Sequence, residues 1–201
     1  MIISSIDWSR NWQIHQQLAT SLVESGNRVL FIENTGVRAP RSGDFGRIRN
    51  RIRNWLKSTR GFCDIRENLT VFSPIFLPFP YSRFVLLVNR YLLSNTIAKW
   101  MNIQRFHDPV LITFLPTPLA QAVIDDIDPA VIIYYCADNM AGGSTGAAQL
   151  RTYEDAFFSK ADAVFCTSHA LLERAEKFSK HVYIFPAGVD FAKFEDALSS
   201  R

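Results

Sequence analysis

The chain has 201 residues, of which 48% are hydrophobic and 20% are charged, and its formal net charge is +3. This composition supplies enough apolar side chains for a packed core, so it excludes a wholly disordered chain. The length suits one large domain or two small ones.

Seven short apolar runs are predicted to be β-strands. Most are continuously apolar and do not alternate with polar residues, which is typical of strands that a parallel sheet buries on both faces. In chain order the runs are Ile2–Ile6, Arg28–Glu33, Leu69–Ser73, Val110–Phe114, Val131–Cys136, Ala163–Thr167 and Val182–Phe185.

Helical patterns lie between these strands. The first has Ile14, Leu18 and Leu22 on one face and ends at Gly26 in the manner of a helix C-cap. Because strands alternate with helices, right-handed βαβ crossovers are predicted. The predicted fold class is α/β: a Rossmann-like, doubly wound, mostly parallel sheet of about seven strands with helices on both faces. The helices are expected at Trp12–Ser25, Arg83–Ile103, Leu119–Ile127, Gln149–Lys160 and Ala170–Phe178.

Cysteine usage and hydropathy indicate a compartment. The three cysteines form no Cys-x-x-Cys pair and no cluster with histidines at metal-ligand spacing, so no metal site is predicted. Cys136 and Cys166 lie in apolar runs, where a reduced thiol packs as a small hydrophobe. A cytoplasmic location is expected. The apolar runs are too short for a signal peptide or a membrane span, which is compatible with peripheral contact at the inner face of the cell membrane.

Several motifs along the chain occur in a specific order. QQLA at residues 16–19 lies in a helix that closes with GNRV at 26–29, and IYYCADN follows at 133–139. The most specific motifs are ADAVFCTS at 161–168 and PAGVD at 186–190, each weak alone but informative at their mutual spacing. Over nearly the whole chain, this order resembles the N-terminal half of a two-domain group-1 glycosyltransferase, family-four-like and retaining, with the GT-B fold.

The resemblance implies an organisation and a function. Residues 1–190 would form the N-terminal acceptor-side domain, and 191–201 would begin the interdomain linker, with Gly188 and Asp190 at the hinge. The donor, a UDP- or GDP-linked nucleotide sugar, would bind to a C-terminal domain that the chain lacks, so no cofactor is expected here. The full enzyme would transfer a sugar to a glycan or lipid-linked acceptor with retention, in the manner of a hexosyltransferase, and the fragment alone would be inactive.

Two departures from the family pattern limit which residue roles can be transferred from the family to this chain. Ala187 stands where the family usually has Asn, so a hydrogen bond from that amide is absent. Many retaining members have a His just after the strand that ends here at Cys136, whereas this chain has Asp138 in that neighbourhood. An imidazole role near the donor sugar is therefore not transferred.

Asp138 is the expected catalytic residue, with Asn139 beside it as a substrate contact. Ligands of open α/β sheets bind outside the carboxyl ends of the strands, and both residues follow a buried strand. Asp138 could hold an acceptor hydroxyl or stabilise positive charge on the donor sugar. Since the leaving phosphate can take the acceptor proton, catalysis would depend on positioning and electrostatics. The structural alternative is a simple Asp-Asn turn.

The loop after the first strand is the expected acceptor contact. Asp7 can accept a hydrogen bond from a hydroxyl, Trp8 offers a stacking face for a sugar, and Arg10 offers charge for a phosphate. The competing interpretation is that Ser9 or Asn11 only caps the following helix.

Four further polar residues have a functional and a structural interpretation. Ser168 and His169 follow the sixth strand and are candidate substrate contacts, although Ser168 as a helix N-cap is the leading structural explanation. His15 lies on the first helix, and its spacing suggests no nucleophilic partner. Glu154 lies in mid-helix, where a solvated position is favoured slightly over one in the cleft.

Residues 38–60 form a basic segment. Eight Arg and Lys side chains and a single Asp give it a formal charge of +7. Apolar residues recur at spacings of three and four, which predicts a helix that contacts an anionic membrane surface. A helix packed on the domain is the alternative, and nucleic-acid binding is not expected because no RNA-binding fold accompanies the charge. The predicted membrane contacts are Arg47, Arg49, Arg51, Arg53 and Trp55.

A rival from another class stays open. A non-catalytic Rossmann-like module that docks to a membrane or a partner would show the same alternation of strands and helices. The glycosyltransferase interpretation requires a donor-binding domain after Arg201, whereas the non-catalytic module does not.

Overall fold

The computed structural model describes residues 1–9, 12–33, 61–77, 82–139, 148–186 and 188. Eight strands form one sheet in the order β3-β4-β2-β1-β5-β6-β7-β8, and every neighbouring pair except β3–β4 is parallel. All seven predicted strands are present, so the predicted α/β class with a mostly parallel sheet is confirmed. The strands are β1 (Ile2–Ile3), β2 (Val29–Ile32), β3 (Phe62–Arg66), β4 (Leu69–Phe72), β5 (Val110–Thr113), β6 (Val131–Cys136), β7 (Ala163–Cys166) and β8 (Val182–Ile184).

The sequence did not predict β3. Four of its five residues are exposed, and it carries Asp64 and Arg66 where the parallel strands carry apolar side chains. It turns back onto β4 through Glu67 and Asn68, and Asn68 adopts a left-handed φ of 63°. Asn is one of the few residues other than Gly that tolerates this conformation. A polar antiparallel strand thus lies at one edge of the sheet, where charge disfavours pairing with another chain.

Two helix starts show how the chain enters the helical layers. α1 begins at Ile14 after Gln13, whose amide nitrogen donates to Gln16 Oε1 at 3.0 Å. The expectation of a cap at Ser9 or Asn11 is therefore wrong for Ser9, and Asn11 lies outside the described residues. Thr117 caps α4 by accepting from the Ala120 amide at 3.2 Å. The helices are α1 (Ile14–Glu24), α3 (Arg83–Gln104), α4 (Pro118–Ile127), α5 (Ala148–Lys160) and α6 (His169–Ala175).

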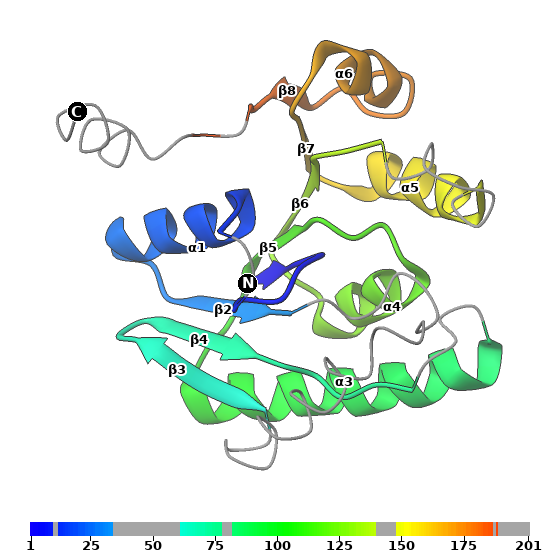
Figure 1. Cartoon of the computed structure of the whole chain (residues 1–201). Coiled ribbons are helices and arrows are strands. Elements are labelled where there is room, and N and C mark those ends of the chain that lie inside the picture. Colours follow the sequence, from blue (N-terminus) through cyan, green and yellow to red (C-terminus); the bar gives the residue numbers. More distant parts are fainter. Residues whose placement is uncertain (10–11, 34–60, 78–81, 140–147, 187, 189–201) are drawn as a thin grey trace, which may run out of the picture.

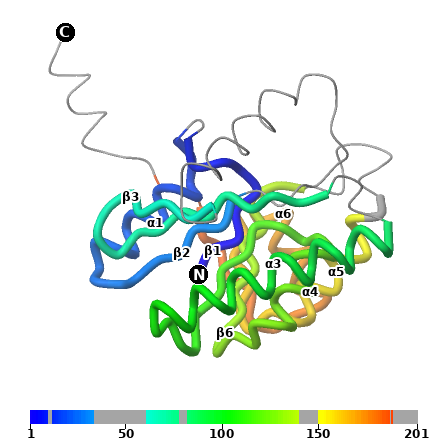
Figure 2. Tube along the Cα trace, turned by 90° about the horizontal axis from the view of Figure 1, so that it is seen from below, coloured from blue at the N-terminus to red at the C-terminus, as the bar shows by residue number. Residues whose placement is uncertain are grey.

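Helices cover both faces of the sheet, as predicted. α1 packs Leu18 and Leu22 against a core that includes Phe31 and Val71. The opposite face is covered by side chains of α3, α4, α5 and α6, with Phe157 and Phe158 among the fully buried ones. Figure 1 shows α1 on one side of the sheet and α3, α4 and α5 on the other. Figure 2 shows the layer of α3, α4 and α5 from below. None of the helices in the described part combines the length and apolar character that a membrane span requires.

Candidate functional site at the carboxyl edge of the sheet

The topology singles out one edge of the sheet. From β1 the chain adds β2 and β4 in one direction, and from β5 it adds β6, β7 and β8 in the other. The order therefore reverses between β1 and β5. Ligands of open α/β sheets bind outside the carboxyl ends of the strands at such a switch point. This edge is the candidate site.

His15 lies at the switch point. Its Nδ1 is 3.1 Å from Ser4 Oγ and its Nε2 is 3.4 Å from Ser5 Oγ. Its ring packs against Phe114 at a tilt of 37°, with 3.8 Å between ring centroids. Burial lowers its pKa from 6.5 to about 4, so the imidazole is neutral near pH 7. Spacing had suggested no partner for His15. The fold supplies two hydroxyls because α1 returns its first turn to the end of β1.

Glu33 ties three strand ends together. Its Oε1 accepts from the Trp8 amide at 2.7 Å and its Oε2 accepts from Ser73 Oγ at 2.6 Å, so it joins the loops after β1, β2 and β4. The carboxylate is buried. Sequence reasoning assigned no role to Glu33. The available signal was one carboxylate at the end of the apolar run RVLFI, where the strand meets the ligand-binding edge.

Part of the loop after β1 packs against the hydrophobic core. Trp8 is half-buried and meets Phe31 edge-on at 4.9 Å between ring centroids. Gln16 Nε2 donates to the Trp8 carbonyl at 3.2 Å and to the Asp7 carbonyl at 3.5 Å, which fixes the path of the loop. Asp7 is also half-buried. Both residues thus lie at the candidate edge, on the β1 side of it, and Arg10 lies outside the described residues.

Asp138 and Asn139 lie together with Ser168 and His169 because β6 and β7 are neighbours. All four are exposed. Thr167 Oγ1 donates to the Ala137 carbonyl at 2.7 Å and so binds the two strand ends to each other. Ser168 occupies the N-cap position of α6, as predicted, although its hydroxyl makes no capping hydrogen bond.

The two groups of predicted contacts are separated by β5. Strands in a sheet are about 4.8 Å apart, so the ends of β1 and β6 are about 10 Å apart. The β5 loop between them is buried from Phe114 to Pro118. Asp7 and Trp8 therefore stand across the switch point from Asp138, at a separation that a sugar ring and its substituents can bridge. Among the described residues, no group of three or more His, Cys, Asp or Glu side chains could hold a metal ion.

Glu154 stands behind the site and is fully buried. The expected positions, on a solvated helix face or in the cleft, are both wrong. Tyr134 Oη donates to its Oε1 at 2.9 Å, and Arg174 Nη1 lies 2.7 Å from its Oε2 in an ion pair without hydrogen-bond geometry. Burial, with the neighbouring Cys136 and Glu154, raises the pKa of Tyr134 well above its usual value. This cluster holds α5 and α6 against β6.

The remaining predictions concern the basic segment and the end of the chain. Gly188 is exposed, and a Cβ placed on it would meet nothing within 4 Å, so close packing does not require glycine there. The hinge role of Gly188 and the domain boundary at residue 190 stay predictions. Six of the named positions lie outside the described residues: Arg47, Arg49, Arg51, Arg53, Trp55 and Asp190.

Solved structures of sucrose-phosphate synthase from Thermosynechococcus elongatus are similar to this chain. One has a TM-score of 0.54 at 13% identity and covers 99% of this chain and 94% of that one. Another has a TM-score of 0.61 at 15% identity and covers 94% of this chain and 47% of that one, so this chain spans about half its length. Sequence comparison matches no family profile and no curated protein. At these identities the likeness shows the fold, which agrees with the predicted Rossmann-like domain of the GT-B type.

Proposed function

We propose that the chain is the N-terminal, acceptor-side domain of a GT-B glycosyltransferase that works in the cytoplasm. The observation that carries the proposal is the switch-point edge: buried Glu33 and His15 hold the ends of β1, β2 and β4 by hydrogen bonds, and exposed polar groups follow β6 and β7 across β5. The fold shared with sucrose-phosphate synthase over nearly the whole chain supports it. Residues 1–190 would be this domain and 191–201 the start of a linker.

The full enzyme would move a sugar from a UDP- or GDP-linked donor to a glycan or lipid-linked acceptor, with retention. The donor would be held by a second domain, which fits the observation that the chain covers 47% of one similar structure. The domain described here would supply the acceptor wall of the cleft. Because the leaving phosphate can take the acceptor proton, the domain's task is positioning and electrostatic stabilisation.

Asp138 would carry most of that task. Its carboxylate is exposed directly after β6 and makes no hydrogen bond or ion pair with any described residue, so it is available to an acceptor hydroxyl or to a positively charged sugar ring. Asn139, Ser168 and His169 would contact the acceptor beside it. Asp7, Trp8 and Arg10 would contact the acceptor from the β1 side.

A transfer assay on the longer protein tests this role. Asp138→Asn keeps the size of the side chain and removes its charge, and it should lower kcat by about 100-fold, as loss of one stabilising group at a reacting centre does. The matched control is Asp128→Asn, which changes an exposed carboxylate at the end of α4 in a left-handed conformation that Asn tolerates. Equal kcat for Asp138→Asn and the wild-type enzyme would remove Asp138 from the mechanism. Tight binding of UDP-glucose or GDP-mannose to residues 1–201 alone would contradict the division of labour between domains.

The acceptor would be lipid-linked if the domain docks on a membrane, and exposed apolar side chains support such docking. Phe84, Leu87 and Tyr91 share one face of α3 and are 72%, 63% and 70% exposed. Ile75 and Leu77 are also exposed, and Leu77 lies on the buried side of α3, where Asn89 accepts from its amide at 2.8 Å and donates to its carbonyl at 3.0 Å. We call Phe84, Leu87 and Tyr91 the apolar patch.

The basic segment joins the described chain at Gly61, close to the exposed Ile75. Gly61 directly follows Arg60, the last residue of the basic segment. The Gly61 carbonyl accepts a hydrogen bond from the Ser73 amide at 2.9 Å, and Ile75 lies two residues after Ser73. Exposed apolar side chains in the same domain as a segment of charge +7 suit an anionic bilayer surface. Each basic residue near such a surface contributes about 1 kcal/mol.

Co-sedimentation with phosphatidylglycerol vesicles tests the docking. Binding should fall as salt rises and should be lost when Arg47, Arg49, Arg51 and Arg53 are all changed to Glu. Phe84→Ser with Leu87→Ser should weaken it, whereas Lys177→Glu, an exposed position just after α6, should not. Binding that is equal on phosphatidylcholine vesicles would show that charge plays no part and would leave the basic segment as a packed or solvated element.

A further inference from the structure

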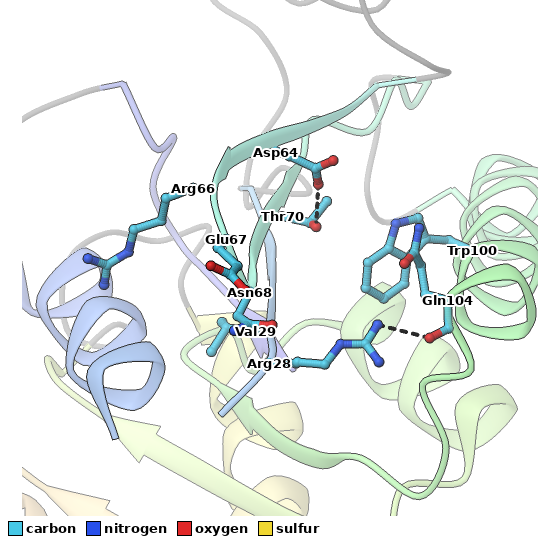
Figure 3. Close-up of a pocket in the computed structure, with 9 residues that line it drawn as sticks. All are labelled: Arg28, Val29, Asp64, Arg66, Glu67, Asn68, Thr70, Trp100 and Gln104. Atoms are coloured by element: carbon cyan, nitrogen blue, oxygen red, sulfur yellow. Dashed lines mark hydrogen bonds between the residues drawn. The ribbon is translucent and has the colours of Figure 1, made fainter. Parts of the chain in front are cut away.

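A pocket of about 270 Å³ lies at the edge of the sheet opposite the candidate site. It is bounded by the starts of β2 and β4, by the β3–β4 turn and by the last turn of α3 (Figure 3). The strands between the two edges, β2 and β4, have four residues each and span about 13 Å. The pocket is therefore a separate place on the domain. None of the residues assigned to the proposed reaction lines it.

The walls of the pocket are held by contacts between distant parts of the chain. Arg28 Nη2 donates to the Gln104 carbonyl at 2.9 Å and so joins the start of β2 to the end of α3. The Val29 amide donates to the Asn68 carbonyl at 2.8 Å, which fixes the β3–β4 turn. Trp100 stacks on Phe62 at an interplanar angle of 10°. The pocket is consequently formed before any ligand arrives, which lowers the entropic cost of binding.

Several polar groups on these walls have unused hydrogen-bonding capacity. Asp64 Oδ1 accepts from Thr70 Oγ1 at 2.6 Å, and its second oxygen has no partner among the described residues. The carboxylate of Glu67 likewise makes no hydrogen bond or ion pair within the described chain. Figure 3 shows Arg66 turning away from the pocket toward α1, where it bonds the Thr20 carbonyl at 3.0 Å.

The mixture of charges selects the class of ligand. Asp64 and Glu67 repel an anion such as a phosphate, while Arg28 repels a cation. A neutral molecule rich in hydroxyl groups is repelled by neither kind of charge. Each of its hydroxyls can donate to a carboxylate and accept from a guanidinium or an amide. The indole of Trp100 adds an amphipathic surface of the kind that suits a sugar ring. The volume lies just below the usual range for drug-sized ligands, about 300–1,000 Å³, and suits a small ligand such as one hexose unit.

We propose that this pocket binds a hexose unit of a neutral glycan, at a distance from the reacting edge. The inference rests on the proposed function in that the glycan would be an outer part of the acceptor, passing around the edge strand β3. Binding there would raise the effective concentration of the acceptor's reacting end at the carboxyl edge. The gain would be largest for long acceptors and absent for acceptors too short to reach both places.

Indole NMR signals can locate the bound glycan. The chain has four tryptophans, so a ¹⁵N-labelled sample gives one indole N–H signal for each, and Trp100→Phe and Trp8→Phe assign two of them. The probes are maltohexaose, cellohexaose and mannohexaose. At least one should shift the Trp100 signal. Glu67→Ala and Gln104→Ala should each lower the affinity for the glycan, measured from the Trp100 shift, about tenfold. A loss of this size is expected when a polar ligand loses a hydrogen-bonding partner. Glu173→Ala, which removes an exposed carboxylate on α6, is the matched control and should leave it unchanged.

The outcomes separate the two proposals. A shift of Trp8 without a shift of Trp100 would place the glycan at the carboxyl edge, which overturns the pocket and leaves the proposed function standing. No shift of Trp100 with any probe, or a response that survives both substitutions, also overturns the pocket. If it holds, Glu67→Ala should raise KM for a long acceptor in the longer protein and leave KM for a monosaccharide acceptor unchanged.

Discussion

Replacement of His15 by glutamine should make the stability of this fold less dependent on pH. His15 is only 4% exposed, and its ring lies between the hydroxyls of Ser4 and Ser5 and against Phe114. Burial lowers its pKa from 6.5 to about 4, because the folded interior disfavours the charged imidazolium. Glutamine retains a polar group that can meet the hydroxyls and removes the titration.

The direction of the effect follows from proton binding. Between pH 6.5 and pH 4 the unfolded chain holds a proton on His15 that the folded chain does not, so stability rises with pH and is lost as pH falls through this window. From about pH 7.5 to about pH 5, His15 alone should lower the free energy of unfolding by about 2 kcal/mol. The amino group of Met1, whose pKa burial lowers to about 5, adds the same loss to the wild-type and variant proteins.

Urea unfolding followed by circular dichroism at the two pH values measures the effect. The wild-type chain should lose about 2 kcal/mol more than His15→Gln on acidification. His107→Gln, which changes an exposed histidine in the loop after α3, controls for the loss of any histidine and should behave as the wild-type chain does. Equal losses for wild type and His15→Gln would mean that the imidazole is solvated in the folded state, and the packing described around Ser4 would then be wrong.

Three further substitutions probe the frame of the domain. Thr117→Ala removes the N-cap bond of α4 and should lower the free energy of unfolding by about 1 kcal/mol in urea titrations. Arg174→Leu strands the fully buried carboxylate of Glu154 and should cost about 3 kcal/mol, with part of the stability returning in the double variant that adds Glu154→Gln. Glu33→Gln weakens the bond to the Trp8 amide, and hydrogen exchange at that amide should become faster; unchanged protection would show that other contacts hold the loop.

The parallel strands and their helices could be predicted because their signals are local. Continuous apolar runs such as VLFI and VIIYYC specify strands buried on both faces, and the alternation with helices specifies the layers. Asp138, Asn139, Ser168 and His169 could be grouped for the same reason, since residues that follow neighbouring parallel strands must meet at one edge. The β3 strand was not predicted, because an exposed edge strand contains no continuous apolar run.

The sequence by itself determined the α/β class, the run of seven parallel strands and the edge where polar groups gather, because these depend on the period of apolar residues along the chain. Only the tertiary structure decided which polar groups are buried together. Glu33 bonds residues 25 and 40 positions away, and Glu154 meets an arginine on the next helix. Neither pairing follows from local sequence, because strand order and helix packing set the distance between residues far apart in the chain. The pocket beside Trp100 arises likewise from three segments that touch only in the folded protein.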